Sequence, residues 1–524
     1  MDWRGVIERE VYKPLEAEFH DRPSNLAEIL LQAKAAFETR TAILYEGDEI
    51  TYESFVESVA TAAYALRYEF GIQAGDRVVI LLGTEPAFGV AVWAAATIGA
   101  VVCPMNIRYQ LPELRYQLRH AEPKAIITDA VLLDRILPLR NELPSVEHIF
   151  ATSHHPTDGV LPFAALINGP KPAEPPFRFV DETAPAFIFY TSGTTGRPKG
   201  VINSQRALIY SILRSRMRDP RGASPEVLCV PIPLHYTGGC KSFLGAIARG
   251  SKCILLKHWK IEDLLKTVQD HRVTNLFALG SIWALAIASP ELDQYDLSSI
   301  RSVFFGGSAT APSIIDRVSK ALPHARVMQG YGMTECNGGT VEEDAIARPT
   351  SSGLPGPTTQ LRIVDEGDAD LPANVLGQVL IRNAQIFSGY WKDPQTTDYV
   401  MRGGWYHSGD MGYLDAAGRL HLAGRANEMI IRGQENIYPA EIEAVILQHP
   451  AVQEAVVLGV PDEIFGEQVK AIVVPQDGRR IDPAEVTRHC RAHLAEFKIP
   501  KFIELRDGPL PRNPGGKVIK RNLL

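Results

Sequence analysis

Short, almost continuously apolar runs alternate with stretches of helical spacing along much of this chain. The apolar runs fall at 76–82, 124–129, 226–234, 252–257, 273–279 and 300–307, and helical spacing is clearest at 111–121 and 261–270. Strands that are apolar on both faces and alternate with helices are typical of a mostly parallel sheet covered by helices on both sides. The pattern therefore predicts an α/β protein.

Residues 87–103 form an uncharged segment that approaches the length of a membrane span. A spanning helix needs roughly 18 to 20 predominantly apolar residues. This segment is shorter, contains Gly89 and Gly99, is rich in alanine rather than leucine, and ends at Pro104. A buried helix that leads into a buried strand explains it better, and we predict no transmembrane segment.

Composition limits the classes of function. At 524 residues the chain is long enough for two or more domains, and its net charge of -7 argues against a nucleic-acid-binding protein. The six cysteines are scattered without a Cys-x-x-Cys pair, which favours a reducing compartment over a zinc site or a disulfide framework. The N-terminal residues carry charges throughout and lack the apolar core of a signal peptide. We expect a cytoplasmic protein.

The pattern changes after Gly424, where strands mix with a helix that begins at Pro439. Proline at the first helical position, followed by acidic residues in the first turn, is a good helix start. A second helix is expected over 483–494. Together these features predict a compact α+β domain of about a hundred residues, a usual domain size. The segments 152–159 and 169–177 are expected to form a surface connection between two subdomains of the larger part.

Residues 187–204, FIFYTSGTTGRPKGVINS, place glycines, hydroxyls and a lysine directly behind an apolar run. One interpretation is a solvated turn, since Gly, Ser and Thr are common in loops. The other is a phosphate-binding loop, in which backbone N–H groups and hydroxyls converge on an anion and Lys199 supplies a counter-charge. The pattern G-x-x-x-x-G-K-[ST] is absent, so the stretch is either a different nucleotide loop or none.

Four further motifs follow: QGYGMTE at 329–335, WYHSGD at 405–410, GRANEMIIRGQEN at 424–436 and NPGGK at 513–517. Taken singly, each has a structural explanation, such as a core tyrosine, a turn carboxylate or a surface lysine. In this order and spacing, together with TSGTTGRPKG, they resemble the adenylate-forming superfamily of acyl-CoA synthetases, non-ribosomal peptide synthetase adenylation domains and luciferases. The resemblance covers essentially the whole chain, from ITYESF at 50–55 to the last lysine loop, and points to the acyl-CoA synthetase branch.

The resemblance implies a large N-terminal domain at 1–424, with mostly parallel sheets covered by helices plus a β subdomain, and a small mobile α+β domain at 425–524. It also implies a ligase that works in two steps. A carboxylate attacks the α-phosphorus of ATP to give an acyl-adenylate and pyrophosphate, and the thiol of coenzyme A then displaces AMP. ATP, Mg²⁺ and coenzyme A are therefore the implied cofactor and co-substrates.

The same motifs imply the nucleotide site. The loop that starts at Thr191 would hold the β- and γ-phosphates of ATP, and Tyr331 would stack on the adenine. Asp410 would accept hydrogen bonds from the ribose hydroxyls, with Arg425 beside it. The residues expected to bind ATP or AMP are Thr191, Ser192, Gly193, Thr194, Thr195, Lys199, Gly307, Ser308, Ala309, Gln329, Gly330, Tyr331, Gly332, Asp410 and Arg425.

Three residues are expected to act on the reacting groups. Thr334 would donate to the α-phosphate, and Lys517 would bridge the substrate carboxylate and the α-phosphate as charge builds there. Glu335 would hold Mg²⁺ through a hard oxygen ligand and is the one metal ligand predicted. The reaction needs no covalent nucleophile, so no cysteine is assigned a catalytic role.

The acyl pocket is expected to be roomy because many glycines border it. His235 and Tyr236 stand where amino-acid-activating relatives place an acidic residue, and a buried unpaired ammonium would be costly. The substrate is therefore expected to be a fatty, aryl or alicyclic acid without an α-amino group. The residues expected to line the pocket are His235, Tyr236, Gly239, Gly280, Trp283, Gly306, Met333 and Cys336.

The thioester-forming step has its own predicted residues. Gly433, Gln434 and Glu435 would line the tunnel for coenzyme A, and Asn427 stands at the hinge, where the family usually has Asp or Lys. The arginine run at 213–222 either contacts the phosphates of coenzyme A or forms an ordinary solvated face. The solvated face is the favoured interpretation.

Two other functions are weighed against the ligase. A stand-alone adenylating enzyme would pass the acyl group to a carrier protein instead of coenzyme A. A non-catalytic sensor on the same scaffold is disfavoured, because it would not need the lysine at 517. The expected partners are a small carboxylic acid and coenzyme A, and the sequence leaves the oligomeric state open, a homodimer included.

Overall fold

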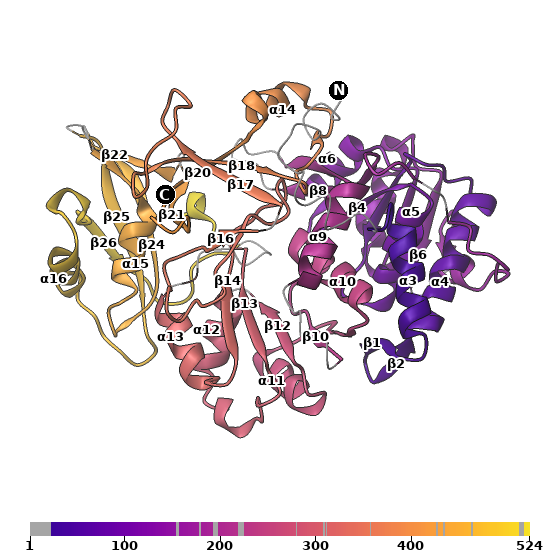
Figure 1. Ribbon diagram of the computed structural model, residues 1–524, viewed down its shortest axis with the longest axis horizontal. Helices are drawn as coiled ribbons and strands as arrows, with labels where there is room; N and C mark the ends of the chain where they lie inside the picture. Colours follow the sequence, from indigo (N-terminus) through magenta and orange to yellow (C-terminus); the bar gives the residue numbers. More distant parts are fainter. Residues whose placement is uncertain are drawn as a thin grey trace.

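The computed structural model describes residues 22–152, 157–177, 180–191, 198–217, 225–278, 280–307, 310, 312–356, 358–425, 428–432, 435–462, 465–512 and 518–523. In Figure 1 the chain runs from an indigo and magenta block on the right, through strands in the centre, to a yellow block on the left. The architecture is mixed α/β, with large parallel sheets, an antiparallel β subdomain and a small α+β unit at the C-terminal end. The predicted fold class is confirmed.

The first large sheet has eight strands, and most neighbouring pairs are parallel. The exceptions are β8 and β9, and β9 and β19, which pair antiparallel. In spatial order its strands are β19 (Gly389–Tyr390), β9 (Lys199–Ser204), β8 (Pro185–Thr191), β4 (Val101–Pro104), β3 (Arg77–Leu81), β5 (Ala125–Thr128), β6 (His148–Ala151) and β7 (Leu161–Pro162).

The second large sheet has seven strands, and all its pairs are parallel except the hairpin of β1 and β2. In order its strands are β14 (Arg326–Gln329), β13 (Ser302–Phe305), β12 (Asn275–Ala278), β10 (Val227–Cys229), β11 (Lys252–Leu255), β1 (Thr41–Tyr45) and β2 (Asp48–Thr51). Strand β10 is shorter than the predicted run at 226–234 because Pro231 and Pro233 lack the N–H that a ladder needs.

Helices cover these sheets, and one apolar core joins them. The core combines side chains of β3 and β4 with those of β10 and β11, together with apolar faces of the helices between the sheets. The helices of this part are α3 (Leu26–Phe37), α4 (Tyr52–Tyr64), α5 (Pro86–Thr97), α6 (Leu111–Ala121), α7 (Leu133–Ile136), α8 (Ala164–Ile167), α9 (Gln205–Met217), α10 (Thr237–Arg249), α11 (Ile261–Asp270), α12 (Gly280–Ala288) and α13 (Pro312–Ala321).

Helix α5 and strand β4 explain the long apolar segment at 87–103. Ten successive residues of α5, from Phe88 to Thr97, are buried, and β4 follows as a fully buried strand. Burial on all sides accounts for the absence of a polar face. Among the helices that the structure describes, none has the length and apolar character to cross a membrane.

An antiparallel subdomain follows β14. Its four-stranded sheet contains β17 (Thr359–Val364), β18 (Gly377–Asn383), β20 (Tyr406–Leu414) and β21 (Leu420–Arg425), next to the short pair β15 (Thr340–Val341) and β16 (Leu354–Pro355). Helix α14 (Pro394–Val400) packs beside β19 and β20. Shorter helical turns among the described residues are η1 (Ala65–Glu69), η2 (Ala130–Leu132), η3 (Leu137–Glu142), η4 (Leu292–Gln294), η5 (Arg402–Gly404), η7 (Glu496–Lys498) and η8 (Lys520–Asn522).

The C-terminal unit is a five-stranded sheet with two helices. Its elements are β22 (Ile430–Arg432), β23 (Glu435–Ile437), α15 (Pro439–Ile446), β24 (Val452–Asp462), β25 (Gly466–Pro475), α16 (Pro483–His493) and β26 (Phe502–Leu505). It has its own apolar core, which includes Ile442, Val457 and Val486. The boundary between 424 and 425 stays a prediction.

All six cysteines are buried as free thiols. This agrees with the expectation that the chain holds no disulfide framework, and burial raises the pKa of the Cys336 thiol to about 11.

Candidate active site

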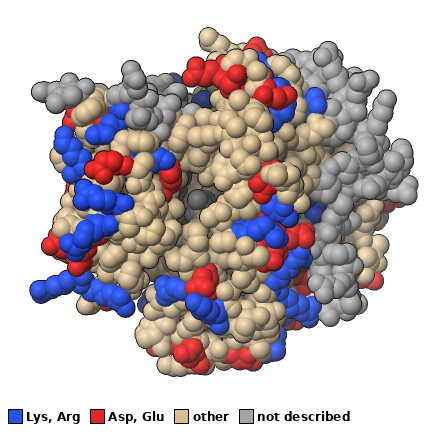
Figure 2. Space-filling model, turned by 60° about the vertical axis from the view of Figure 1, so that its left-hand side comes forward, with Lys and Arg blue, Asp and Glu red and all other residues tan. Residues whose placement is uncertain are grey.

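A large cavity of about 2870 Å³ lies where the two sheets, the antiparallel subdomain and the C-terminal end of the chain meet. It collects residues from β8, β9, α9, α10, β12, β14, β20 and the segment 518–520. In Figure 2 acidic and basic side chains are interspersed over one face of the molecule, and a hollow opens near its centre.

The predicted phosphate loop joins two antiparallel strands at this cavity. Thr191 at the end of β8 pairs with Lys199 at the start of β9, and both line the cavity. Ser192, Gly193, Thr194 and Thr195 lie outside the described residues. The Lys199 amino group lies 5.0 Å from the centre of the Tyr390 ring, a cation–π distance.

The motif at 329–335 folds back on itself. The carbonyl of Tyr331 accepts the N–H groups of Gly339, at 2.8 Å, and Thr340, at 3.1 Å. A Cβ at Gly332 would lie 2.6 Å from the Cα of Gly338, so this close approach needs glycine. Gly330, Tyr331, Gly332 and Gly307 line the cavity, while Ser308 and Ala309 lie outside the described residues.

Gln329, predicted to bind nucleotide, has a structural role in this conformation. Its side-chain amide donates to the carbonyl oxygens of Arg348, Pro349 and Ser351. Its backbone also exchanges two hydrogen bonds with Glu342. Gln329 therefore anchors the segment that follows the motif, and it is absent from the cavity lining.

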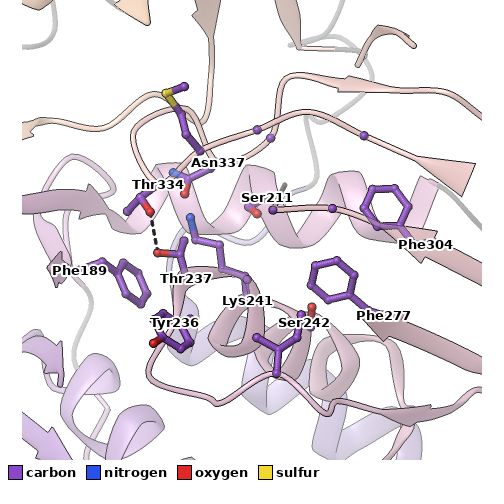
Figure 3. Close-up of a pocket in the computed structure, with 18 of the residues that line it drawn as sticks. Phe189, Ser211, Tyr236, Thr237, Lys241, Ser242, Phe277, Phe304, Thr334 and Asn337 are labelled. Carbon is purple, nitrogen blue, oxygen red and sulfur yellow. Dashed lines mark hydrogen bonds between the residues drawn. The ribbon is translucent and has the colours of Figure 1, made fainter. Parts of the chain in front are cut away.

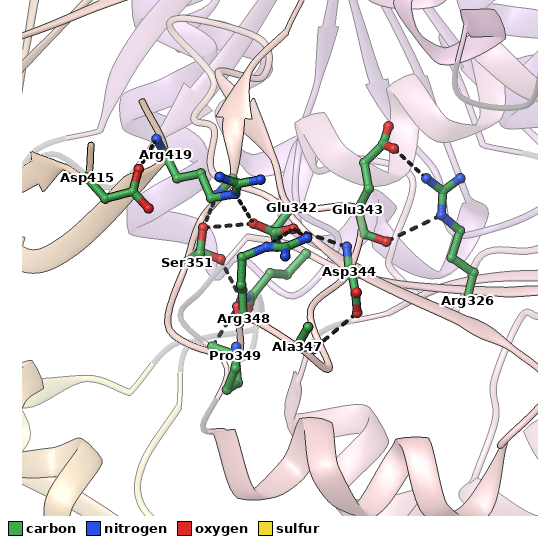
Figure 4. A network of polar contacts seen from close by, with 12 residues as sticks. Arg326, Glu342, Glu343, Asp344, Ala347, Arg348, Pro349, Ser351, Asp415 and Arg419 are labelled. Atoms are coloured by element: carbon green, nitrogen blue, oxygen red, sulfur yellow. Dashed lines mark hydrogen bonds and ion pairs between the residues drawn. The ribbon is translucent and has the colours of Figure 1, made fainter. Parts of the chain in front are cut away.

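Figure 4 shows the polar network around Glu342, which supports this anchor. The Glu342 carboxylate is almost fully buried, lies 3.0 Å from Arg348 and 3.4 Å from Arg419, and accepts a hydrogen bond from Ser351. Arg419 stands just before β21, so the network ties the antiparallel subdomain to the edge of the seven-stranded sheet. It fixes the base of the motif that carries Tyr331 and Glu335.

Asp410 and Arg425 are cross-strand partners on β20 and β21. Arg425 Nε lies 3.1 Å from Oδ1 of Asp410, and the Tyr331 hydroxyl donates to Oδ2 over 2.6 Å. Burial would lower the pKa of Arg425, but the Asp410 carboxylate raises it. Arg425 and Gly409 line the cavity, and Asp410 lies just behind them, 6% exposed.

Thr334 and Glu335 line the same cavity as Thr191 and Lys199. The hydroxyls of Thr334 and Thr237 are 3.0 Å apart, which links the motif to the start of α10 (Figure 3). The Tyr390 hydroxyl donates to Oε1 of Glu335 over 2.9 Å. Burial raises the pKa of Glu335, and the Tyr390 hydrogen bond opposes that rise.

The C-terminal end of the chain reaches the same cavity. Arg512 and Val518 form a bridge on either side of the lysine loop, and Val518 lines the cavity. Lys517 itself lies outside the described residues. Lys520 lies 3.0 Å from Glu428 and 3.2 Å from Glu443, and these carboxylates raise its pKa although burial would lower it.

Part of the predicted acyl pocket lines the cavity: His235, Tyr236, Gly306 and Met333. Burial lowers the pKa of His235 to about 3, so its ring is neutral, and its Nε2 has no partner among the described residues. The Tyr236 hydroxyl accepts a hydrogen bond from Asn106 over 3.1 Å.

Gly239, Gly280, Trp283 and Cys336 lie behind the cavity wall, so the expectation that they form it needs correction. A Cβ at Gly239 would collide with the carbonyl of Pro233, and one at Gly280 would lie 2.8 Å from Thr310. These glycines allow close packing and do not widen the pocket. Trp283 packs against Phe305 in the core of the seven-stranded sheet, and Cys336 lies in the core beneath the antiparallel subdomain.

Most of the residues predicted for the thioester-forming step are not among the residues that the structure describes. Asn427, Gly433 and Gln434 lie outside the described residues. Glu435 is described only in its backbone, as the first residue of β23.

Tyr390, Arg214 and Lys241 are among the cavity-lining residues that the sequence prediction missed, whereas Asn337 falls within the stretch 333–338 that was expected to line the acyl pocket. Lys241 has a recognisable signal, since it is a lone cation between Cys240 and the apolar stretch at 243–248. Arg214 belongs to the arginine run expected to be solvated, yet its side chain is buried. That expectation is wrong for Arg214.

Comparison with known proteins agrees with this geometry. A family described as "AMP-binding enzyme" matches residues 31–391, and its C-terminal domain matches residues 441–517. The chain belongs to the AMP-binding enzyme family. It is an enzyme of the branch that contains the AMP-forming acid–CoA ligases.

Three relatives illustrate the range of this family. A long-chain-fatty-acid–CoA ligase from Bacillus subtilis is 31% identical, with 98% of each chain covered. A feruloyl-CoA synthase from Amycolatopsis sp is 32% identical over 92% of this chain and 94% of the relative. The solved anthranilate CoA ligase AuaEII, in complex with anthranoyl-AMP, superposes with a TM-score of 0.88 at 25% identity, covering 96% of this chain and 98% of that one.

Proposed function

We propose that this AMP-binding enzyme is an ATP-dependent carboxylic acid–CoA ligase that forms an acyl-adenylate and then an acyl-CoA thioester. The observation that carries the proposal is the meeting of three pairs around one cavity: Thr334 with Thr237, Glu335 with Tyr390, and Asp410 with Arg425. Fatty-acid, feruloyl and anthranilate CoA ligases among the relatives support a carboxylic acid as substrate and an acyl-adenylate as intermediate.

In the first step a carboxylate oxygen attacks the α-phosphorus of ATP. The bond from that phosphorus to the oxygen that bridges the α- and β-phosphates breaks, and pyrophosphate leaves with the electron pair. Thr191 and Lys199 would hold the phosphates that leave, and Thr334 would donate to the α-phosphate. Arg425 and Tyr331 hold the Asp410 carboxylate in place. Asp410 would accept hydrogen bonds from the ribose hydroxyls once the Tyr331 and Arg425 side chains shift to admit the nucleotide.

Glu335 fits a magnesium site. Mg²⁺ usually keeps several waters and binds through one or two carboxylates plus substrate phosphates. Glu335 supplies one carboxylate held by Tyr390, and no group of three or more metal-ligating side chains occurs within the described ranges. When bound, the ion would neutralise charge on the ATP phosphates, and Glu335 would fix its position.

In the second step the thiol of coenzyme A gives its proton to water and attacks the carbonyl carbon of the acyl-adenylate. The bond from that carbon to the phosphate oxygen breaks, and AMP leaves. We propose that the C-terminal unit turns about Asn427 between the two steps, so that Lys517 acts in the first and Gly433 lets the thiol pass in the second. Transfer to a carrier protein is the alternative second step.

Mass spectrometry of the products tests the proposal. The purified protein is incubated with ATP, Mg²⁺ and a panel of aliphatic, aryl and alicyclic acids, with and without coenzyme A. We expect AMP and an acyl-CoA from at least one acid. An acyl-adenylate that accumulates and does not react with coenzyme A would support the carrier-protein alternative, and ADP as the nucleotide product would contradict both.

A further inference from the structure

Arg214 on α9 is a buried guanidinium without a hydrogen-bond or ion-pair partner among the described residues. Its side chain is only 6% exposed, and Nη2 is fully enclosed without a hydrogen bond. No described residue forms an ion pair or hydrogen bond with it. An arginine carries five N–H donors and stays charged in proteins, so leaving it unpaired in the interior is costly. Burial accordingly lowers its pKa.

The surroundings of Arg214 are shaped to fit it. The guanidinium lies against Gly338 and Gly356, and a Cβ at Gly356 would lie 2.8 Å from its Nε. A Cβ at Gly338 would also collide with the guanidinium. The two glycines therefore leave space for the charged group at the wall of the cavity, which Arg214 lines.

A second cation, Lys241, lines the same cavity. It rises from α10, and in Figure 3 its side chain runs toward Asn337. Its amino group donates to the neutral oxygen Oδ1 of Asn203 over 3.0 Å, and no carboxylate of the described residues forms an ion pair with it. Burial lowers its pKa to about 7.

Polar and apolar neighbours complete the picture. Asn337, adjacent in sequence to Gly338, lines the cavity, as does Ser211, one turn before Arg214 on α9. The rings of Phe189, Phe277 and Phe304 line the same cavity, and in Figure 3 Phe189 lies on one side of the Lys241 side chain and the other two rings on the opposite side. The cavity thus combines an apolar wall with two cations that form no ion pair with a carboxylate of the described residues.

We propose that the acid activated by this enzyme carries a second carboxylate, which Arg214 and Lys241 bind while an apolar spacer contacts the phenylalanine rings. This substrate class rests on the proposed ligase function. A carboxylate matches the fork of a guanidinium with two parallel hydrogen bonds, and a lysine that lines the same cavity adds a point charge. The second carboxylate would supply the negative charge that no described residue places within ion-pair distance of these two cations.

The test compares each dicarboxylic acid with its matched monoacid. The panel contains α,ω-diacids from four to ten carbons against the monoacids of equal length, and terephthalic acid against 4-methylbenzoic acid. Acid-dependent pyrophosphate release gives kcat/KM for each. We expect at least a tenfold preference for the diacid in one or more pairs, and a preference for the monoacid in every pair would overturn the proposal.

Variants locate the preference. Arg214→Met and Lys241→Met should each lower the ratio of diacid to monoacid at least tenfold, by reducing kcat/KM for the diacid, and Arg214→Lys should restore part of it. Arg488→Met and Lys266→Met change exposed cations and serve as matched controls. A ratio that does not change in Arg214→Met would overturn the assignment.

A binding measurement separates this proposal from the ligase function. If no acid releases pyrophosphate, the ligase proposal fails. Calorimetry with the diacids alone then decides whether the cavity binds a second carboxylate. Heat of binding in the wild type that is lost in Arg214→Met would support the carboxylate site. No binding of any diacid would overturn it.

Discussion

The Tyr331 hydroxyl donates to Oδ2 of Asp410 over 2.6 Å, while Arg425 lies 3.1 Å from Oδ1 of the same carboxylate. The tyrosine comes from the turn after β14, and the other two residues come from neighbouring strands of the antiparallel subdomain. The pair of contacts thus joins the parallel sheet to the antiparallel sheet at the proposed nucleotide site.

Asp410→Asn should weaken nucleotide binding. The amide keeps the shape but removes the charge that pairs with Arg425, and hydrogen bonds to charged groups contribute about 1.5 to 3 kcal/mol. We expect the KM for ATP to rise by about tenfold to a hundredfold, measured by pyrophosphate release. Asp415→Asn, in the turn between β20 and β21, is the matched control, and an equal effect there would argue against a ribose contact.

Tyr390→Phe should move the acidic limb of the pH–rate profile upward. Burial raises the pKa of Glu335, and the Tyr390 hydroxyl lowers it by donating to the ionised form. Without that donor the pKa rises further, so a higher pH is needed to ionise the metal ligand. The measurement is kcat/KM for adenylation between about pH 5 and pH 8, a range that covers the pKa values of buried carboxyl groups. Tyr68→Phe, an exposed tyrosine, should leave the limb where it is.

Lys241→Met should stabilise the protein below neutral pH when no substrate is present. The folded-state pKa is depressed to about 7 by burial. Between that value and the unfolded pKa near 10.4, the unfolded state binds more protons, so wild-type stability rises with pH through this window. We expect the free energy of unfolding of Lys241→Met to exceed that of the wild type by about 2 to 4 kcal/mol at low pH. The difference should disappear as the pH approaches about 10, near the pKa of a lysine in the unfolded chain.

Urea denaturation at several pH values measures this gap, with Lys266→Met as the control. A Lys241→Met protein that is less stable than the wild type at every pH would contradict the prediction, because it would show that the hydrogen bond to Asn203 outweighs the cost of burying the charge.

Lys517 and Lys520 should separate catalysis from stability. Lys517→Ala is predicted to slow adenylation by about 10²- to 10³-fold, because it removes a preorganised cation, and to leave Tm unchanged. Lys520→Met breaks the contacts with Glu428 and Glu443, and it should destabilise the protein by about 1 to 3 kcal/mol. Pyrophosphate release and thermal unfolding are measured for both variants. A loss of Tm in Lys517→Ala as large as that in Lys520→Met would contradict the prediction.

Gly433→Trp should spare adenylation and slow thioester formation. The prediction follows from its proposed place in the coenzyme A tunnel, where a bulky side chain would block the thiol. Rapid-quench measurement of acyl-adenylate and acyl-CoA separates the two steps. Equal loss of both would remove Gly433 from the tunnel.

The sequence predicted local elements well where burial and spacing agree. Helices α6 and α11 begin and end at the predicted residues, because each has one apolar face and acidic residues in its first turn. The antiparallel subdomain was not predicted strand by strand, since its pairing depends on partners distant in sequence, such as Asp410 and Arg425.

The candidate site was predictable only where motifs are local. The motif at 329–335 is contiguous, so Tyr331, Thr334 and Glu335 could be assigned from the sequence. Gly239 and Gly280 misled because a glycine that permits close packing looks the same in sequence as one that opens a pocket. The burial of Arg214 depends on Gly338 and Gly356, which lie far along the chain.

An isotope-transfer experiment tests the central claim most directly. The acid identified by the product screen is labelled with ¹⁸O in its carboxylate and incubated with ATP, Mg²⁺ and coenzyme A, and the AMP is analysed by mass spectrometry. Attack of the carboxylate on the α-phosphorus predicts one ¹⁸O in AMP for each acyl-CoA formed. AMP without label would contradict the acyl-adenylate mechanism.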